Sequence, residues 1–188
     1  MKTQLIALCF LLAFAACNKK VDNDSKEMAE DQNEEKFEDT KVEDDTEFAV
    51  AAADGGLLEV KLGELAVANG ASPEIKKFGQ SMVDDHGKAN LELKGLAEQK
   101  QITIPTTLSD KKQEKYDDLA AKKGAEFDEA YAEFMVKDHK DDIDAFKKEA
   151  DKGHDSELKA WAAEKVPVLE HHLMMAEAAE KMVKDKKN

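Results

Sequence analysis

The chain contains no arginine, and its 42 acidic residues outnumber its 28 lysines, which gives a net charge of −14 at pH 7. Nucleic-acid binding needs clustered cations and usually employs arginine, so this composition argues against nucleic acid as a partner. Aromatic residues make up only 6% of the chain, and there are nine glycines and three prolines. This scarcity of strand and turn formers favours an all-α fold of a few long helices over a sandwich or barrel.

Cysteine is equally scarce, because the chain has only Cys9 and Cys17. Residues 1–16 have the features of a signal peptide, with Lys2 near the start, an apolar run over residues 5–14, and two alanines before Cys17. The apolar run is too short to cross a bilayer as a helix. Removal of residues 1–16 would leave one cysteine, so we expect export without a disulfide framework.

The tripeptide Phe14-Ala15-Ala16 before Cys17 resembles the lipobox at which bacterial lipoprotein precursors are lipidated and cut, although that pattern prefers an aliphatic residue at the position of Phe14. We therefore expect a membrane anchor through a lipidated Cys17; an ordinary cleaved signal with an incidental cysteine is the alternative. Asn18 follows the cysteine. By resemblance to lipoprotein sorting in double-membraned bacteria, a residue other than Asp there predicts delivery to the outer membrane, on a face that the sequence leaves undecided.

Residues 17–45 form an acidic segment with few apolar side chains. Residues 18–45 hold twelve acidic residues and five lysines. Such a stretch buries too little apolar surface to offset the entropy of ordering, so we expect residues 17–45 to be a disordered, self-repelling tether. The acids could act as a cation-attracting brush, but a solvated linker is the simpler interpretation.

From Thr46 onward, apolar residues recur at spacings of three and four, which predicts helices. We expect helices over residues 46–69, 73–100, 109–152 and 156–184. The third should break near Gly124, and Pro167 should kink or restart the fourth. Four long helices with short links predict an antiparallel four-helix bundle over residues 46–184, followed by a tail of residues 185–188.

Two of these helices carry the same motif, an aromatic residue followed by x-x-x-Met-Val-x-Asp-His. It ends at His86 in one helix and at His139 in the other. Both histidines occupy apolar seams, as do Glu59 on the first helix and His172 on the fourth. A buried polar group costs about 1–3 kcal/mol without a partner, so these polar residues are expected to meet.

Imidazoles and a carboxylate that converge in a bundle core are typical of a metal site. The predicted ligands of a divalent transition metal, zinc, copper or iron, are Glu59, His86, His139 and His172, and the predicted supporting residues are Met82, Asp85, Met135 and Asp138. A buried hydrogen-bond network without metal is the alternative interpretation. The carboxylate-bridged di-metal site of ferritin-like oxidases needs Glu-x-x-His on two helices. Here valine or leucine stands three residues before each seam histidine, so that site is not encoded.

The motifs together are similar to the bacterial family of domains of unknown function numbered 4142. The resemblance is carried by Asp54-Gly55-Gly56, Ser72-Pro73-Glu74, the two Met-Val-x-Asp-His motifs and Pro167-x-Leu169-x-x-His172. It implies a ferritin-like four-helix fold and an exported or outer-membrane location, and it implies no activity. No nucleophile elbow or phosphate loop occurs, so we assign no enzymatic reaction. We expect an envelope lipoprotein that binds metal; the alternative is a non-catalytic interaction or structural module whose protein partner is unknown.

Overall fold

The computed structural model describes residues 24–186, and within this range the chain is all-α, as the sequence predicted. The described residues form six helices, α1 (Ser25–Phe37), α2 (Glu43–Asn69), α3 (Pro73–Lys100), α4 (Asp110–Ala120), α5 (Gly124–Lys152) and α6 (Ser156–Asp185). The predicted signal peptide, Cys17 and Asn18 lie outside the described residues. None of the described helices is long and apolar enough to cross a membrane.

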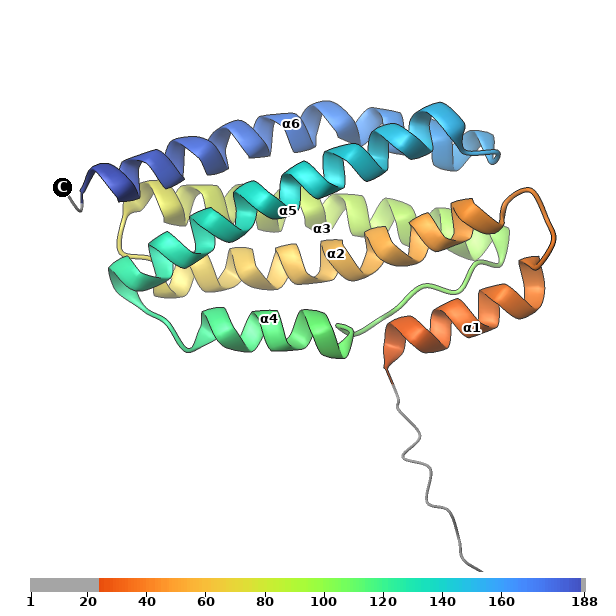
Figure 1. Ribbon diagram of the computed structural model, residues 1–188, viewed down its shortest axis with the longest axis horizontal. Helices are drawn as coiled ribbons and strands as arrows, with labels where there is room; N and C mark the ends of the chain where they lie inside the picture. The colour runs from red at the N-terminus through yellow and green to blue at the C-terminus, as the bar shows by residue number, and fades with distance from the viewer. Residues whose placement is uncertain (1–23, 187–188) are drawn as a thin grey trace, which may run out of the picture.

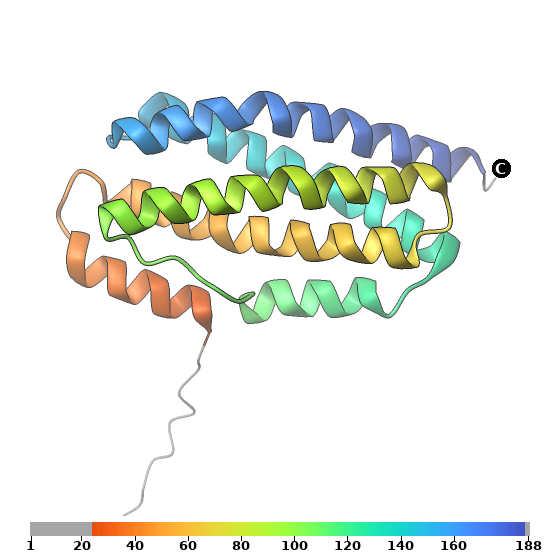
Figure 2. The same cartoon turned by 180° about the vertical axis from the view of Figure 1, so that it is seen from behind.

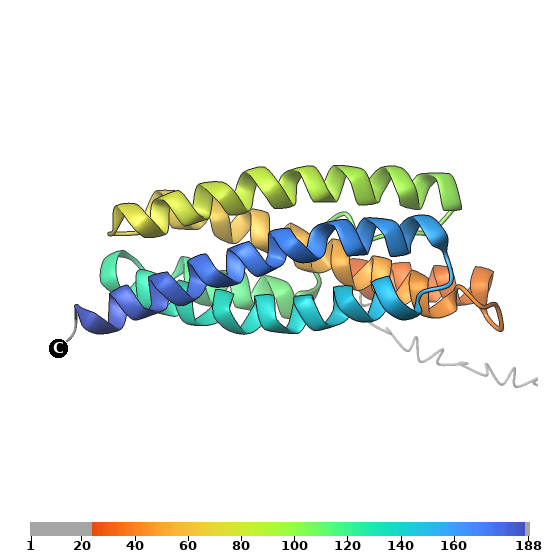
Figure 3. The same ribbon diagram turned by 90° about the horizontal axis from the view of Figure 1, so that it is seen from above.

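The four long helices lie side by side, and the two short ones cover one side of them (Figures 1 and 2). α2 packs along α3 and α5 packs along α6, while contacts of α3 with α6 and of α2 with α5 join the two pairs. The view from above shows all four running lengthwise (Figure 3). α1 and α4 both pack against α2. The segment predicted as one helix over residues 109–152 therefore forms the short α4 and the long α5, and α1 is a helix that the sequence did not predict.

Helix boundaries follow local chemistry. The side chains of Asp24, Ser109 and Asp155 accept hydrogen bonds from the first backbone N–H groups of α1, α4 and α6. The predicted break near Gly124 is confirmed, because α4 ends at Ala120 and α5 begins at Gly124, whose φ is +62°. α6 continues through Pro167, so the helix does not restart there.

The prediction of a disordered tether over residues 17–45 is wrong for its described part, because Ser25–Phe37 form α1. Ala29 and Asn33 are buried. The side-chain amide of Asn33 donates to the carbonyl oxygen of Thr103 at 2.8 Å and accepts from the N–H of Thr103 at 2.7 Å. Composition correctly indicates a polar segment, but it does not reveal that a few specific contacts fix this segment on the bundle.

Three buried aspartates hold the connections between helices in place. Asp45 accepts from the N–H groups of His154 and Asp155 in the turn between α5 and α6. Asp54 accepts from the N–H and hydroxyl of Ser109 at the start of α4. Asp128 accepts from Ala71 and Ser72 between α2 and α3. In each of these carboxylates both oxygens accept hydrogen bonds.

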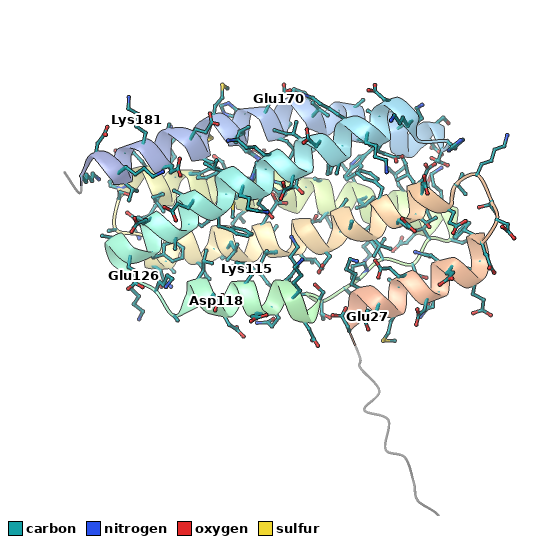
Figure 4. All side chains as sticks on the ribbon, in the orientation of Figure 1. Glu27, Lys115, Asp118, Glu126, Glu170 and Lys181 are labelled. Atoms are coloured by element: carbon teal, nitrogen blue, oxygen red, sulfur yellow. The ribbon has the colours of Figure 1, made fainter. Side chains whose placement is uncertain are left out.

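The core consists of two apolar clusters with a polar layer between them. One cluster contains Phe78, Met82, Tyr131 and Met135, and the other contains Ala49, Leu93, Leu158 and Trp161. His86 on α3 and His139 on α5 belong to this layer, and along each helix they fall between side chains of the two clusters. Charged side chains labelled in Figure 4 point outward from the ribbon, namely Glu27, Lys115, Asp118, Glu126, Glu170 and Lys181. The polar layer is thus a separate feature of the interior.

Candidate metal centre

The three predicted histidines converge in the middle of the bundle, each from a different long helix. His86 comes from α3, His139 from α5 and His172 from α6. Their ring centroids lie 5.7 Å (His86–His139), 5.1 Å (His86–His172) and 5.5 Å (His139–His172) apart. His139 and His172 are completely buried, and His86 is 7% exposed. The structure therefore brings the three imidazoles into one nearly equilateral group.

One nitrogen of each imidazole has an oxygen partner outside the group. His86 Nδ1 lies 2.8 Å from Glu59 Oε2, and His172 Nε2 lies 2.9 Å from Asp85 Oδ2. His139 Nδ1 lies 3.1 Å from the backbone oxygen of Met135. A carbonyl oxygen only accepts, so His139 Nδ1 carries the hydrogen. Metal-binding histidines typically donate their second N–H to a carboxylate or carbonyl in this way.

The remaining nitrogens, His86 Nε2, His139 Nε2 and His172 Nδ1, form a candidate ligand set. Ligand atoms of the three histidines lie within 4.8 Å of one another. His86 Nε2 is 3.2 Å from His172 Nδ1. Two ligands at 2.0–2.1 Å from a tetrahedral zinc are separated by about 3.3 Å, so this spacing suits two nitrogens on one cation. His139 Nε2 is buried and has no hydrogen-bond partner among the described residues.

Burial keeps all three imidazoles neutral near pH 7. It lowers the pKa of His86 to about 4, although the carboxylates of Asp142, Asp138 and Asp85 oppose the shift. Burial, followed by the charges of the other two histidines, lowers the pKa of His139 to about 3. Burial and the charge of His86 lower the pKa of His172 to about 4. Neutral imidazole is the form that binds a metal.

Glu59 connects this group to a cluster of three acids. Its Oε2 meets His86, and its Oε1 lies 3.6 Å from His139 Nε2. Carboxylate oxygens of Glu59, Asp138 and Asp142 lie within 4.8 Å of one another. Burial and the charge of Asp138 raise the pKa of Glu59 well above 4.5, and burial and the charge of Glu59 raise the pKa of Asp142 well above 3.8.

The supporting residues predicted from the sequence have distinct places. Asp85 is the partner of His172, and Met135 supplies its backbone oxygen to His139. The side chains of Met82 and Met135 are buried in an apolar cluster. Asp138 belongs to the acid cluster and lies 3.6 Å from Lys112 Nζ. Glu59 contacts the outer nitrogen of His86, which is the position of a carboxylate that orients an imidazole.

Sequence reasoning gave no role to Asp142 or Lys112. Asp142 lies on the same seam as His139, three residues further along α5, and this spacing could have drawn attention to it. Lys112 is on α4, and it reaches the acid cluster only because α4 packs against α2 and α5. No local pattern in the sequence marks that lysine as part of a site.

A small cavity leads from the surface to His86. It measures about 110 Å³ and is lined by residues of α3, α5 and α6, namely Asp85, His86, Lys88, Ala89, Phe146, Glu164, Lys165, Val168 and Leu169. Asp85 is half-exposed, with 49% of its side-chain surface accessible. The cavity therefore offers a short route between solvent and the imidazole group.

Comparison with known proteins identifies the family. The model of a domain of unknown function (DUF4142) matches residues 26–179. The chain belongs to this family. The match begins inside α1, so the DUF4142 domain includes most of the helix that composition assigned to a tether. No curated protein and no solved structure matches the chain. The family description names no activity, so function has to be argued from the residues.

Proposed function

We propose that the helical domain binds a divalent transition metal through His86, His139 and His172 and serves in metal handling or stress protection at the cell envelope. One observation carries this proposal: three buried imidazoles converge while the second nitrogen of each meets an oxygen partner. Three nitrogen ligands with a further position open to water or a substrate describe a common type of zinc site.

The positions of the ring hydrogens on His86 and His172 also support metal binding. When Glu59 is ionised, His86 Nδ1 donates to it and His172 Nε2 donates to Asp85, which leaves lone pairs on His86 Nε2 and His172 Nδ1 facing each other at 3.2 Å. These two lone pairs repel each other, and a cation between the nitrogens removes the repulsion because both lone pairs then coordinate it. When Glu59 is protonated, it donates to His86, and His86 donates to His172, which completes a hydrogen-bonded chain that needs no metal. We infer that the two patterns are the metal-bound and metal-free states.

Variants of two adjacent histidines test metal binding at this site. His172 is buried in the group, whereas His171 is its exposed neighbour on α6. The chain is stripped with a chelator and titrated with Zn²⁺ and Cu²⁺ while the melting temperature and the heat of binding are measured. A ligand at one hundred times its Kd stabilises the folded state by about 2.7 kcal/mol. We expect this stabilisation in the wild type and in His171→Gln, and its loss in His172→Gln.

Two results would contradict the proposal. One is a wild type whose melting temperature does not respond to any transition metal and that carries none after purification. The other is equal binding by His171→Gln and His172→Gln, since that would place the metal elsewhere. Either result would favour the buried hydrogen-bond network and a structural or protein-binding role.

We further propose that the chain is exported and anchored to the outer membrane by a lipidated Cys17. The proposal rests on the sequence of residues 1–18, with an apolar run and two alanines before the cysteine. Lipid attachment is measured by mass spectrometry of the N-terminal peptide and by membrane fractionation. Cys17→Ser should release the chain from the membrane fraction; an unmodified Cys17 in the wild type would refute the anchor.

A further inference from the structure

The acid cluster formed by Glu59, Asp138 and Asp142 lies beside the imidazole group and is not explained by it. The cluster joins α2 with two positions one turn apart on α5. Lys112 of α4 is the basic side chain that contacts it, at 3.6 Å from Asp138 Oδ1. Three carboxylates thus face one lysine, so a single positive charge is set against three acidic groups.

The hydrogen bonding of these acids differs from that of the three buried aspartates that hold the helix connections. Asp45, Asp54 and Asp128 each have both oxygens hydrogen-bonded to N–H or O–H groups of a turn or helix start. In contrast, Glu59 Oε1 and Asp138 Oδ2 are buried and accept no hydrogen bond from an N–H or hydroxyl group within the described part of the chain. Glu59 and Asp142 hydrogen-bond to each other only when one of the two acids carries a proton. Glu59 is only 3% exposed, and its Oε1 points toward the completely buried His139 Nε2 at 3.6 Å.

Buried acceptors without donors are rare in folded proteins, and each costs about 1–3 kcal/mol. The three structural aspartates show that this chain can satisfy buried carboxylates with backbone donors. At the acid cluster it provides one lysine and leaves two oxygens without an N–H or hydroxyl donor. Such convergent, electron-rich oxygens match the ligand set of a cation that prefers oxygen.

We infer that Glu59, Asp138 and Asp142 form a second cation site, with oxygen ligands, that takes a divalent ion such as Mn²⁺. Glu59 serves both sites, because Oε2 orients His86 while Oε1 faces the acid cluster. Lys112 acts as a competing internal cation, whose ammonium group is displaced from Asp138 when the ion binds. The chain then holds two cations of different chemistry, one on nitrogen and one on oxygen ligands.

The test uses the whole chain and Mn²⁺, whose free form is measured by electron paramagnetic resonance. The imidazole group is first filled with Zn²⁺, and Mn²⁺ is then titrated in. Asp142→Asn removes one ligand at constant size, and Asp144→Asn, at an exposed position on the same helix, is the matched control. We expect one Mn²⁺ per wild-type chain, unchanged binding in Asp144→Asn and at least about tenfold weaker binding in Asp142→Asn.

Two further variants test the same acid site, and circular dichroism separates a lost ligand from a lost fold. Asp138→Asn repeats the test of Asp142→Asn at a second ligand, and helical circular dichroism checks that both variants fold. Lys112→Met removes the competing cation and should tighten Mn²⁺ binding about tenfold, as expected for deleting one charge near a partly buried ion.

The test of the acid site does not depend on whether the imidazole group binds zinc. His172→Gln should lose zinc yet keep Mn²⁺. If the wild type binds no Mn²⁺, if both Asp→Asn ligand variants bind like Asp144→Asn, or if Mn²⁺ binding disappears in His172→Gln, the second site is refuted. If zinc fails to bind while Mn²⁺ binds with the expected variant pattern, the proposed imidazole site is wrong and the acid site stands.

Discussion

Binding of zinc should release one proton per metal ion, and Glu59 should be its source. In the metal-free chain, burial and the charge of Asp138 raise the pKa of Glu59 well above 4.5, which favours the protonated form of its carboxyl group. Zinc on His86 Nε2 requires the hydrogen of His86 to move to Nδ1, which lies 2.8 Å from Glu59 Oε2. Glu59 must then accept that hydrogen bond, and so it gives up its own proton.

The expected magnitude follows from the histidines. Their pKa values of about 4, 3 and 4 mean that above pH 5 the imidazoles have no proton to lose. Release should therefore be one proton, where three imidazoles with the usual pKa of about 6.5 would release up to three below pH 6. While Glu59 remains protonated in the metal-free chain, affinity for zinc should rise tenfold per pH unit, which corresponds to about 1.4 kcal/mol.

Isothermal titration calorimetry in two buffers with different heats of ionisation counts the protons directly. Glu59→Gln is the decisive variant, because the amide oxygen can accept from His86 without any ionisation. It should bind zinc with no proton release and with an affinity independent of pH above 5. The reasoning is refuted if the wild type releases none, if Glu59→Gln releases as many as the wild type, or if two or three protons leave near pH 6.

Other regions give three further predictions. Burial and the charges of two nearby acids raise the pKa of Glu149 to about 7, so Glu149→Gln should add about 2 kcal/mol of stability above pH 7 and none below pH 4.5, as urea denaturation across pH will show. Ala89→Trp should fill the cavity at His86 and slow zinc uptake and release equally, whereas Ala178→Trp on an exposed face should change neither in stopped-flow experiments. Asn33→Ala strips two hydrogen bonds from Thr103 and should cost about 2–3 kcal/mol, with faster hydrogen exchange in α1; unchanged exchange would refute its anchoring role.

The long helices and the meeting of the histidines could be predicted because both follow from periodicity. His86, His139 and His172 each occupy an apolar seam, and a bundle core has one interior in which such seams face one another. The helical spacing of polar residues therefore predicts which side chains meet in the core, without knowledge of side-chain conformations. The seam pattern also included Glu59, whose carboxylate does meet His86.

Other parts of the site depend on packing that has no periodic signature. The sequence predicted Glu59 as a ligand, yet which oxygen meets which imidazole nitrogen is set by side-chain torsions and helix rotation. Lys112 joins the acid cluster through the position of α4, a short helix that packs against α2 and α5. α1 was missed because its composition is highly polar, while its attachment depends on a few specific contacts, among them the buried amide of Asn33.

Anomalous X-ray diffraction from crystals of the zinc-loaded chain shows whether one cation binds among the three imidazoles. We expect a zinc peak about 2.0–2.1 Å from His86 Nε2, His139 Nε2 and His172 Nδ1, with Glu59 and Asp85 still in contact with the opposite nitrogens of His86 and His172. A map without a peak at this position, or with zinc only on exposed residues such as His171, would contradict it.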